Sequence, residues 1–426
     1  MKQSGVEWIG KIPEDWKVYR NKNAFICNKE IVGKNSNSTQ LLSLTTGGIK
    51  CKDINNAEGK LPESFDTYQY VKKNDVVMCL FDLDMSAVFS GISQYDGMIS
   101  PAYKVLSCQD RANPLFVHYW FSYIFDGRKF NHYAKNIRYT LNYDEFATLP
   151  ILLPPKETQQ CIASYLDKKC NKIEETIQNQ QQVIEKLKAY KQSLITEAVT
   201  GKVKIANGKA CGEYESYKDS GVEWIGKIPS EWEVKKLKFS SQIMRGLFSH
   251  RPRNDPDYYD GVHPFIQTGE VARAVKYITT YSQTLNELGF SVSREFPAGT
   301  VLLTIAANVG DVAILDFNAC FPDSVIGFYP KENVSKIFMF YVLKSMKEQF
   351  MRNAIISTQM NLNINIVKEE FIPLPSLAEQ KEIVKFLEKK SDYIDTAIEQ
   401  KQNLIEKLTE YKKSLIYECV TGKKEI

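Results

Sequence analysis

Apolar residues recur at helical spacing along two long stretches, one at the end of each half of the chain. The first, residues 156–200, contains no Pro or Gly, and its apolar positions are Ile162, Leu166, Ile173, Ile177, Ile184, Leu187, Leu194 and Ala198. The second, residues 376–421, repeats the pattern with Ile383, Leu387, Ile394, Ile398, Ile405, Leu408, Leu415 and Cys419. Steps of three, four and seven place these side chains on one helix face. The pattern predicts two long amphipathic helices.

Start and stop signals bound both predicted helices. A proline precedes each one (Pro155 or Pro375) and a glycine follows it (Gly201 or Gly422), as is typical of helix ends. At 1.5 Å per residue, about 45 residues extend roughly 67 Å. A compact domain of about 150 residues is much smaller, because its radius of gyration is only about 15 Å. The apolar stripes must therefore pack outside their own domains, and the nearest candidate for each helix is the other.

The residues before each helix alternate short apolar runs with turn residues, which is typical of strands. Strands are predicted at 41–44, 75–81 and 102–106 in the first half, and at 263–267, 299–307, 311–315 and 324–330 in the second. Two further apolar segments, 116–125 and 337–346, are predicted to be short helices. The fold class expected for each half is therefore α+β, of mixed helix and strand.

The two halves begin and end with copies of the same segments. Residues 4–18 match residues 220–234 at 12 of 15 positions, and residues 184–202 match residues 405–423 at 14 of 19. Between these ends the halves diverge almost completely, so the ends perform one task twice while the middles perform different tasks. The expected organisation is two variable domains (1–154 and 220–375), two helices (155–202 and 376–426) and a polar linker (203–219).

Composition excludes several classes of protein. With 426 residues, 43% hydrophobic and 25% charged, the chain is expected to be globular with two or three cores. It lacks an apolar run of the signal-peptide or membrane-spanning kind, so a cytoplasmic protein with no membrane partner is expected. Its nine cysteines are scattered without a CxxC pair, which argues against a disulfide framework or a zinc site.

Motifs that would indicate catalysis are weak or missing. Residues 5–12 follow the spacing of a phosphate-binding loop only as far as Lys11, because Ile12 stands where a magnesium-binding hydroxyl is needed. Trp8 and Ile9 are better explained as apolar anchors. Asp323, which follows a proline, lacks the partners of a nuclease metal site and is read as a turn residue. With no cofactor loop and no methyltransferase tetrapeptide for a flipped base, the sequence indicates a binding protein and not an enzyme.

Local charge supplies a signal that the overall net charge of +4 does not. Residues 235–254 contain six basic residues and no acidic one, and residues 128–143 combine four basic residues with aromatics, again without an acid. Basic side chains interleaved with aromatic ones suit contacts to phosphates and bases. A solvated basic face is the alternative explanation.

Alignment of the halves suggests base-reading positions. Residues 138–142 (RYTLN) align with residues 359–363 (QMNLN), so Leu and Asn are kept while the three positions before them differ. Arginine suits guanine, whereas glutamine and asparagine suit adenine. The alternative is that Leu141 and Leu362 are core residues and the rest has drifted. The predicted DNA-binding residues are Lys135, Arg138, Tyr139, Thr140, Asn142, Lys235, Arg245, Arg251, Arg253, Gln359, Asn361 and Asn363.

Several of these segments together resemble the specificity subunits of Type I restriction-modification enzymes. The resemblance rests on the opening residues 4–16, the helix starts 153–174 and 374–395, and the helix ends 193–202 and 414–423, and it covers essentially the whole chain. One departure is Glu157-Thr158-Gln159-Gln160, where the second half has the more typical Ala378-Glu379-Gln380.

This resemblance implies two target-recognition domains, each reading half of a bipartite site in double-stranded DNA. The helices would form an antiparallel coiled coil with pseudo-twofold symmetry. At about 3.4 Å per base pair, helices of roughly 67 Å would limit the half-site span to about 20 base pairs. The chain itself would be non-catalytic and without a cofactor. Two methyltransferase subunits would supply S-adenosylmethionine, and restriction subunits in the larger complex would use ATP and magnesium.

Two alternatives of different classes stay open at this point. One is a coiled-coil scaffold whose unlike domains bind proteins or glycans, and the other is an enzyme with an unrecognised site. Salt distinguishes the first, because DNA binding through several Lys and Arg contacts weakens steeply as salt rises. Turnover by the purified chain alone would identify the second.

Overall fold

The computed structural model describes residues 1–53, 62–134, 139–356 and 360–426. Backbone contacts divide them into two units, one made of Met1–Gln181 with Lys401–Ile426 and the other of Gln182–Gln400. Each unit contains one variable domain, the first part of the helix that follows it and the last part of the other helix. The division therefore falls inside both long helices, whereas the sequence pattern suggested boundaries at the helix ends.

A four-stranded antiparallel sheet forms the centre of the first unit. Its order is β4 (Phe25–Asn28), β11 (Lys104–Cys108), β8 (Val76–Met78) and β9 (Ser90–Ile92). Helix α1 (Pro114–Asp126) packs on it through an apolar face that is continuous with the core. Smaller elements are β1 (Lys2–Gln3), β2 (Lys11–Ile12), β5 (Leu42–Thr45), β6 (Gly48–Cys51), β7 (Gln69–Val71), β10 (Gly97–Ile99) and α2 (Tyr143–Thr148).

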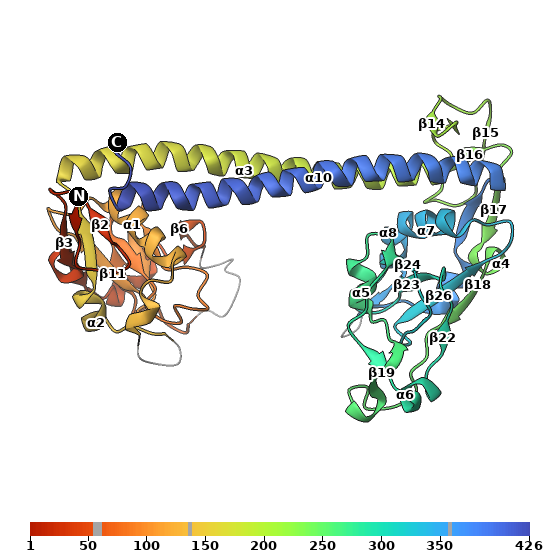
Figure 1. The fold of residues 1–426 in the computed structure, drawn as a ribbon, viewed down its shortest axis with the longest axis horizontal. Coiled ribbons are helices and arrows are strands. Elements are labelled where there is room, and N and C mark those ends of the chain that lie inside the picture. Colours follow the sequence, from red (N-terminus) through yellow and green to blue (C-terminus); the bar gives the residue numbers. More distant parts are fainter. Residues whose placement is uncertain (54–61, 135–138, 357–359) are drawn as a thin grey trace. The chain divides into compact units, whose positions relative to one another are not determined.

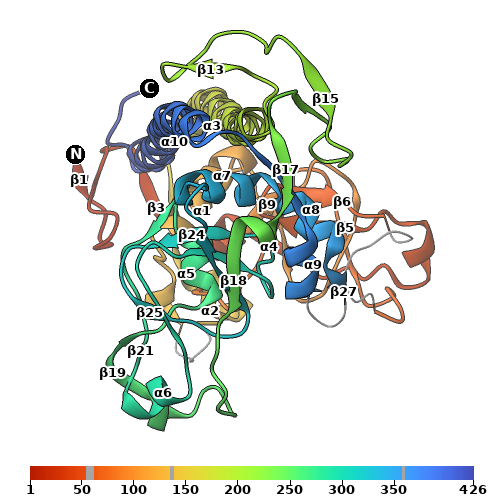
Figure 2. The same ribbon diagram turned by 90° about the vertical axis from the view of Figure 1, so that its right-hand side faces the viewer.

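The second unit has the same sheet order, with one strand added. It runs β18 (Ser241–Arg245), β26 (Val325–Pro330), β23 (Val301–Thr304), β24 (Val312–Leu315) and the parallel β20 (Tyr277–Ile278). Helix α7 (Lys336–Ser345) takes the place of α1 and lies between the sheet and the long helices (Figures 1 and 2). The middles that diverged in sequence therefore share one topology, and the predicted α+β class is confirmed.

The second unit contains further short helices and strands. They are α4 (Leu237–Ser240), β19 (Tyr259–Pro264), α5 (Thr268–Arg273), β21 (Thr284–Leu285), α6 (Glu287–Ser291), β22 (Glu295–Phe296), β25 (Ala319–Cys320), α8 (Lys347–Asn353), β27 (Ile355–Ile356), β28 (Met360–Asn361) and α9 (Ile364–Glu369). In both units the chain enters and leaves the variable domain through one strand pair. These pairs are β3 (Lys17–Arg20) with β12 (Pro150–Leu153), and β17 (Glu233–Lys236) with β29 (Phe371–Leu374).

The two predicted long helices are α3 (Lys156–Val199) and α10 (Leu377–Val420). They run antiparallel within each unit, where equivalent ion pairs join them. Lys412 pairs with Glu174 in the first unit, and in the second the Lys191 Nζ lies 2.6 Å from an Asp395 carboxylate oxygen. No helix in the described part of the chain has the length and apolar character needed to cross a membrane.

The repeated ends of the halves pack against each other. Gly422 (φ +70°) ends α10 against the rings of Pro13 and Trp16, and Gly201 (φ +71°) ends α3 against Pro229 and Trp232. A side chain at either glycine would clash with these rings and strain the left-handed backbone. Each opening segment is thus held by the helix end of the other half, which explains why both segments are duplicated.

Residues 203–219 are more structured than a plain linker. They contain the hairpin of β13 (Ile205–Ala206) and β14 (Lys209–Ala210), and β15 (Tyr217–Asp219), which pairs with β16 (Lys227–Pro229). The Gly208 amide donates to Glu382 on α10 at 2.7 Å, and Tyr214 packs edge-on against Trp232. The polar composition of the segment does not indicate that these few residues anchor it.

Candidate nucleic-acid interface

The same main-chain hydrogen bond positions the predicted base-reading segment in each unit. The Leu141 amide donates to the Leu80 carbonyl at 2.8 Å, and the Leu362 amide donates to the Ile305 carbonyl at 2.8 Å. Leu80 and Ile305 lie just beyond equivalent strands, β8 and β23. The described residues before the shared Leu-Asn, Tyr139-Thr140 and Met360-Asn361, therefore lie at the same end of equivalent inner strands in both domains.

The shared Leu-Asn pair has a structural role. Leu141 and Leu362 are 2% and 1% exposed. The Asn142 Oδ1 accepts from the Glu145 amide at 2.9 Å in a capping box that begins α2, and the Asn363 Oδ1 accepts from the Asn365 amide at 2.9 Å to begin α9. Helix capping by Asn satisfies amides that the helix leaves unpaired. Leu141 and Leu362 are thus core residues, as the alternative explanation proposed. Asn142 and Asn363, which were predicted to contact DNA, use their side-chain oxygens in these helix caps.

The remaining predicted readers are placed only in part. Lys135, Arg138 and Gln359 lie outside the described residues. Tyr139 is 38% exposed, has a φ of +46°, and its carbonyl accepts from the Leu83 amide at 3.2 Å. The Thr140 hydroxyl accepts from the Asp82 amide at 3.4 Å. Asn361 is exposed in the short strand β28.

Three predicted arginines in the second unit converge on Asp323. The Arg245 Nε donates to the Asp323 carbonyl at 2.6 Å, the Arg251 Nη2 lies 3.4 Å from the carboxylate, and Arg253 pairs with the other carboxylate oxygen. Sequence reasoning missed a fourth arginine, Arg294, whose Nη1 donates to the Arg245 carbonyl at 3.3 Å. These five residues, the Asp323 cluster, combine four guanidinium groups with one carboxylate, which suits a phosphate-rich partner.

Main-chain hydrogen bonds join the segment that carries Asp323 and the predicted reading segment at the same end of the inner strand β23. The Ile305 amide donates to the Ser324 carbonyl at 2.9 Å, while the Ile305 carbonyl accepts from Leu362. The segment that carries Asp323 and the predicted reading segment therefore both hydrogen-bond to one residue, Ile305, just beyond β23. Arginines that could contact phosphates and an asparagine that could contact a base thus lie on segments that meet at this strand end.

Lys235 is not part of this cluster. It lies in β17 opposite Ile372 of β29, the strand that leads into α10. Its ammonium pairs with Glu233 at 2.7 Å. The next two lysines, Lys236 and Lys238, both bind Glu369 and hold the pKa of that carboxyl down at about 2. The basic run that looked uniform in the sequence is thus divided between two places.

Aromatic packing supports the loop that carries the arginines. His250 stacks on Tyr258 with ring centroids 3.8 Å apart, and its Nε2 lies 2.9 Å from an Asp255 carboxylate oxygen. Phe248 is 2% exposed and packs against Phe265. This small apolar cluster fixes the backbone from which Arg251 and Arg253 project.

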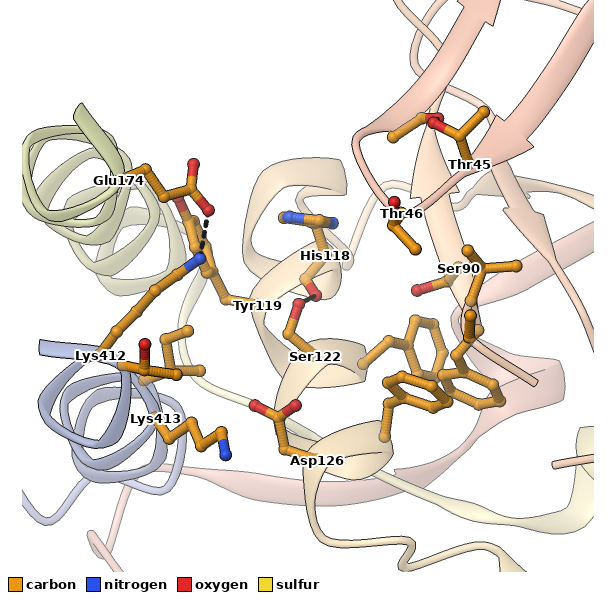
Figure 3. Close-up of a pocket in the computed structure, with 18 residues that line it drawn as sticks. Thr45, Thr46, Ser90, His118, Tyr119, Ser122, Asp126, Glu174, Lys412 and Lys413 are labelled. Atoms are coloured by element: carbon orange, nitrogen blue, oxygen red, sulfur yellow. Dashed lines mark hydrogen bonds and ion pairs between the residues drawn. The ribbon is translucent and has the colours of Figure 1, made fainter. Parts of the chain in front are cut away.

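A cavity of about 320 Å³ lies in the first unit between α1 and the long helices. Figure 3 shows His118, Ser122 and Asp126 along one face of α1, with the Lys412 and Glu174 pair beside them. Burial lowers the pKa of His118, and the Lys412 ammonium lowers it further. Counted from the N-cap residues of α1 and α7, which are Asn113 and Ser335, two larger side chains, Phe340 and Lys344, take the positions of His118 and Ser122 in the second unit. The cavity belongs to the contact between domain and helices, and residues 80–83 and 139–141 are not among those that line it.

Among the described residues, no group of three or more His, Cys, Asp or Glu side chains is arranged to hold a metal ion. Burial raises the pKa of Cys79 and raises that of Cys108 to about 12. These two thiols are therefore poor nucleophiles.

Comparisons with known proteins agree with this geometry. The family model described as the Type I restriction modification DNA specificity domain matches residues 229–408. The putative type I restriction enzyme MjaX specificity subunit of Methanocaldococcus jannaschii is 25% identical over 405 residues, covering 91% of this chain and 89% of the relative. The MjaIX specificity subunit of the same organism is 32% identical over 180 residues, 41% of this chain and 40% of that one.

Solved structures are similar in fold. A chain from a study of complex assembly and conformational transition of the type I R-M system has a TM-score of 0.73 at 14% identity, covering 97% of this chain and all of that one. The HsdS subunit from Thermoanaerobacter tengcongensis has a TM-score of 0.51 at 16% identity, covering 100% of both chains. At these identities the likeness concerns the fold alone.

Proposed function

This chain belongs to the specificity subunits of Type I restriction-modification systems, and we propose that each of its variable domains reads one half of a bipartite site in double-stranded DNA. The observation that carries the proposal is the equivalent hydrogen bond of Leu141 and Leu362, which places unlike residues, Tyr139-Thr140 and Met360-Asn361, at the same end of equivalent inner strands. One scaffold with different readers is what two different half-sites require.

Charge and chemistry at the edge of the second domain support DNA as the partner. The exposed side chains of Arg245, Arg253 and Arg294 lie in one cluster, and Asn361 is exposed in β28, where it pairs with Ala306 just beyond β23. Arginine contacts phosphates and guanine, and asparagine contacts adenine. The comparisons do not support the alternative of a scaffold for proteins or glycans.

As a specificity subunit the chain is a non-catalytic component of its complex, and the catalytic cofactors belong to its partners. S-adenosylmethionine is proposed to bind the methyltransferase subunit, and ATP with magnesium the restriction subunit. The purified chain should therefore transfer no methyl group to DNA on its own.

The repeated helix ends offer two equivalent places for methyltransferase subunits. Tyr190 on α3 and Tyr411 on α10 occupy the same position of the duplicated segment and are 54% and 53% exposed. Exposed tyrosines are enriched at protein interfaces, and a surface present twice can bind two copies of one partner. This duplication supports the proposal of two methyltransferase subunits per chain.

Salt dependence of DNA binding tests the proposed function. The sequence methylated by the assembled complex is identified first, and its affinity for the chain with its methyltransferase partner is then measured from about 50 to 200 mM salt. The logarithm of the affinity should fall linearly, by about 0.9 for each phosphate contact. A scrambled duplex should bind more weakly at every salt concentration. A flat salt response, or equal binding of both duplexes, contradicts DNA recognition.

A further inference from the structure

We propose that Asp323 is a positioning residue for base recognition by the second domain. Its carboxylate holds Arg251 and Arg253 in defined places, its main-chain carbonyl holds Arg245, and its charge limits their attraction to DNA of any sequence. The proposal rests on the proposed function and adds to it the source of discrimination at one half-site.

Each arginine of the cluster uses its guanidinium differently. The Arg251 Nη1 donates to the carbonyls of Phe248 and His250 at 2.6 and 2.7 Å, and its Nη2 faces Asp323. These three contacts within the protein stabilise the loop that contains Phe248, His250 and Arg251. It is therefore the arginine of the cluster least available to DNA.

Arg245 keeps the part of its guanidinium that reads guanine. Only its Nε is engaged, with the Asp323 carbonyl, and in the described part of the chain no protein acceptor lies on its two Nη groups. A guanidinium has five donors, and its paired Nη groups form a fork suited to guanine or phosphate. Fixing the Nε leaves this fork pointing in one direction.

Arg253 is held from both ends. Its Nη2 pairs with the Asp323 carboxylate, and its carbonyl accepts a hydrogen bond from the Tyr259 hydroxyl. Long charged side chains lose conformational freedom when they bind, and prior ordering reduces that cost. Asp323 therefore orders Arg253 before DNA arrives.

The carboxylate also opposes the attraction that the arginines exert on any phosphate. The Asp323 side chain is 31% exposed, so its charge acts at the surface where DNA would approach. Sequence-independent affinity rises with the number of cations that neutralise phosphates. Loss of this charge should increase binding to all DNA while it releases Arg253 from its defined position; the main-chain contact of Arg245 stays.

The test compares Asp323→Asn with the unchanged chain, each assembled with its methyltransferase subunit. The affinity is measured for the recognised duplex and for duplexes changed at single base pairs of the second half-site. We expect discrimination to fall roughly five- to tenfold, as for loss of one well-placed base contact. Affinity for a scrambled duplex should rise, with a salt slope steeper by about one unit.

Matched variants separate positioning from folding and from charge alone. Asp323→Glu keeps the charge and should recover most of the discrimination. Glu388→Gln removes a carboxylate of similar exposure that pairs with Lys276 on the other side of the domain, and it should leave discrimination unchanged. Thermal unfolding of all variants shows whether each is folded.

The possible outcomes decide the proposal. Reduced discrimination together with stronger binding to scrambled DNA supports it. Equal loss of both affinities, unchanged discrimination, or the same effect from Glu388→Gln overturns it. If the unchanged complex itself shows no preference for any duplex, the proposed function fails instead.

Discussion

A buried glutamine at the start of each long helix makes the same three hydrogen bonds in both units. The Gln159 Oε1 accepts from the Asn113 amide, while its Nε2 donates to the carbonyls of Arg111 and Pro154, all at 2.8 Å. Gln380 repeats this with the amide of Ser335 and the carbonyls of Asn333 and Pro375, at 2.8 to 3.0 Å. A buried amide that lost these partners would be costly. The departure at residues 157–160 therefore alters the neighbours of this glutamine and keeps the glutamine itself.

The same equivalence identifies His118 with Phe340, because each lies five residues beyond the amide that the glutamine binds. The His118 Nδ1 is buried and has no hydrogen-bond partner among the residues that the structure describes. Burial together with the Lys412 charge lowers the pKa of His118, against the opposing influence of Glu174 and Asp167. The pKa of His118 in the folded protein lies below its unfolded value of about 6.5. As the pH falls, the unfolded chain therefore binds a proton at this histidine before the folded chain does. The free energy of unfolding then decreases as the pH falls below about 6.5.

We predict that His118→Phe reduces the acid sensitivity of the protein. The melting temperature measured at pH 7.5 and at pH 5.5 should differ by a few degrees less in this variant, because the phenylalanine cannot take up a proton. His132→Phe, which replaces an exposed histidine, serves as the control and should keep the original difference. An unchanged pH dependence in His118→Phe would show that this histidine is not a source of acid sensitivity.

At the scale of elements, the two long helices belong to both units at once. Each helix packs first on the domain that precedes it and then on the opposite domain, and the ion pairs Glu174 with Lys412 and Asp395 with Lys191 set the antiparallel alignment locally. An element continuous through both units is suited to set the distance between two half-sites. We propose this measuring role for α3 and α10.

Lengthening both helices tests the measuring role. Seven residues inserted after Gln181 in α3 and before Lys401 in α10 keep the apolar stripe nearly in phase and add about 10 Å. The methylated site should then contain a spacer longer by about three base pairs, with both half-sites unchanged. Sequencing of methylated DNA reads both quantities. The same insertion between Gly212 and Glu213, outside the helices, should change neither, and an unaltered spacer in the lengthened helices would contradict the measuring role.

At the scale of the whole molecule, the same contact between a helix end and an opening segment occurs twice. The Lys423 Nζ donates to the Ile9 carbonyl at 3.1 Å, and the Lys202 Nζ donates to the Ile225 carbonyl at 3.2 Å. Each half of the duplicated sequence thus supplies the helix end of one contact and the opening segment of the other. Whatever binds the surface of the conserved helix ends should meet it twice, at Tyr190 and at Tyr411.

We predict that these two tyrosines determine how many methyltransferase subunits bind. Tyr190→Ala or Tyr411→Ala alone should leave one subunit per chain, and the double variant should leave none at concentrations about tenfold above those that saturate the unchanged chain. Native mass spectrometry counts the subunits. Tyr393→Ala removes a tyrosine that is 77% exposed but has Lys172 at the equivalent position of α3, and it should not alter the count. Two subunits retained by each single variant would place the interface elsewhere.

Elements whose signals are local or repeated could be predicted from the amino-acid sequence. The two helices, the predicted strands and the duplication follow from periodicity and identity, because side-chain spacing within a helix or strand depends on neighbours along the chain. The candidate Arg245, Arg251 and Arg253 were found from local charge, and the importance of Leu141 and Leu362 from the alignment.

Tertiary structure alone decided which of these residues act together. Asp323 is about 70 residues from the arginines that it holds, and Arg294 joins them from a separate loop, so spacing along the chain could not reveal the cluster. It likewise separated Lys235 from that cluster, assigned Asn142 and Asn363 to helix caps, and showed that unlike middles share one sheet order. The physical reason is that hydrogen bonds between strands and ion pairs between loops depend on proximity in space, which only the folded chain creates.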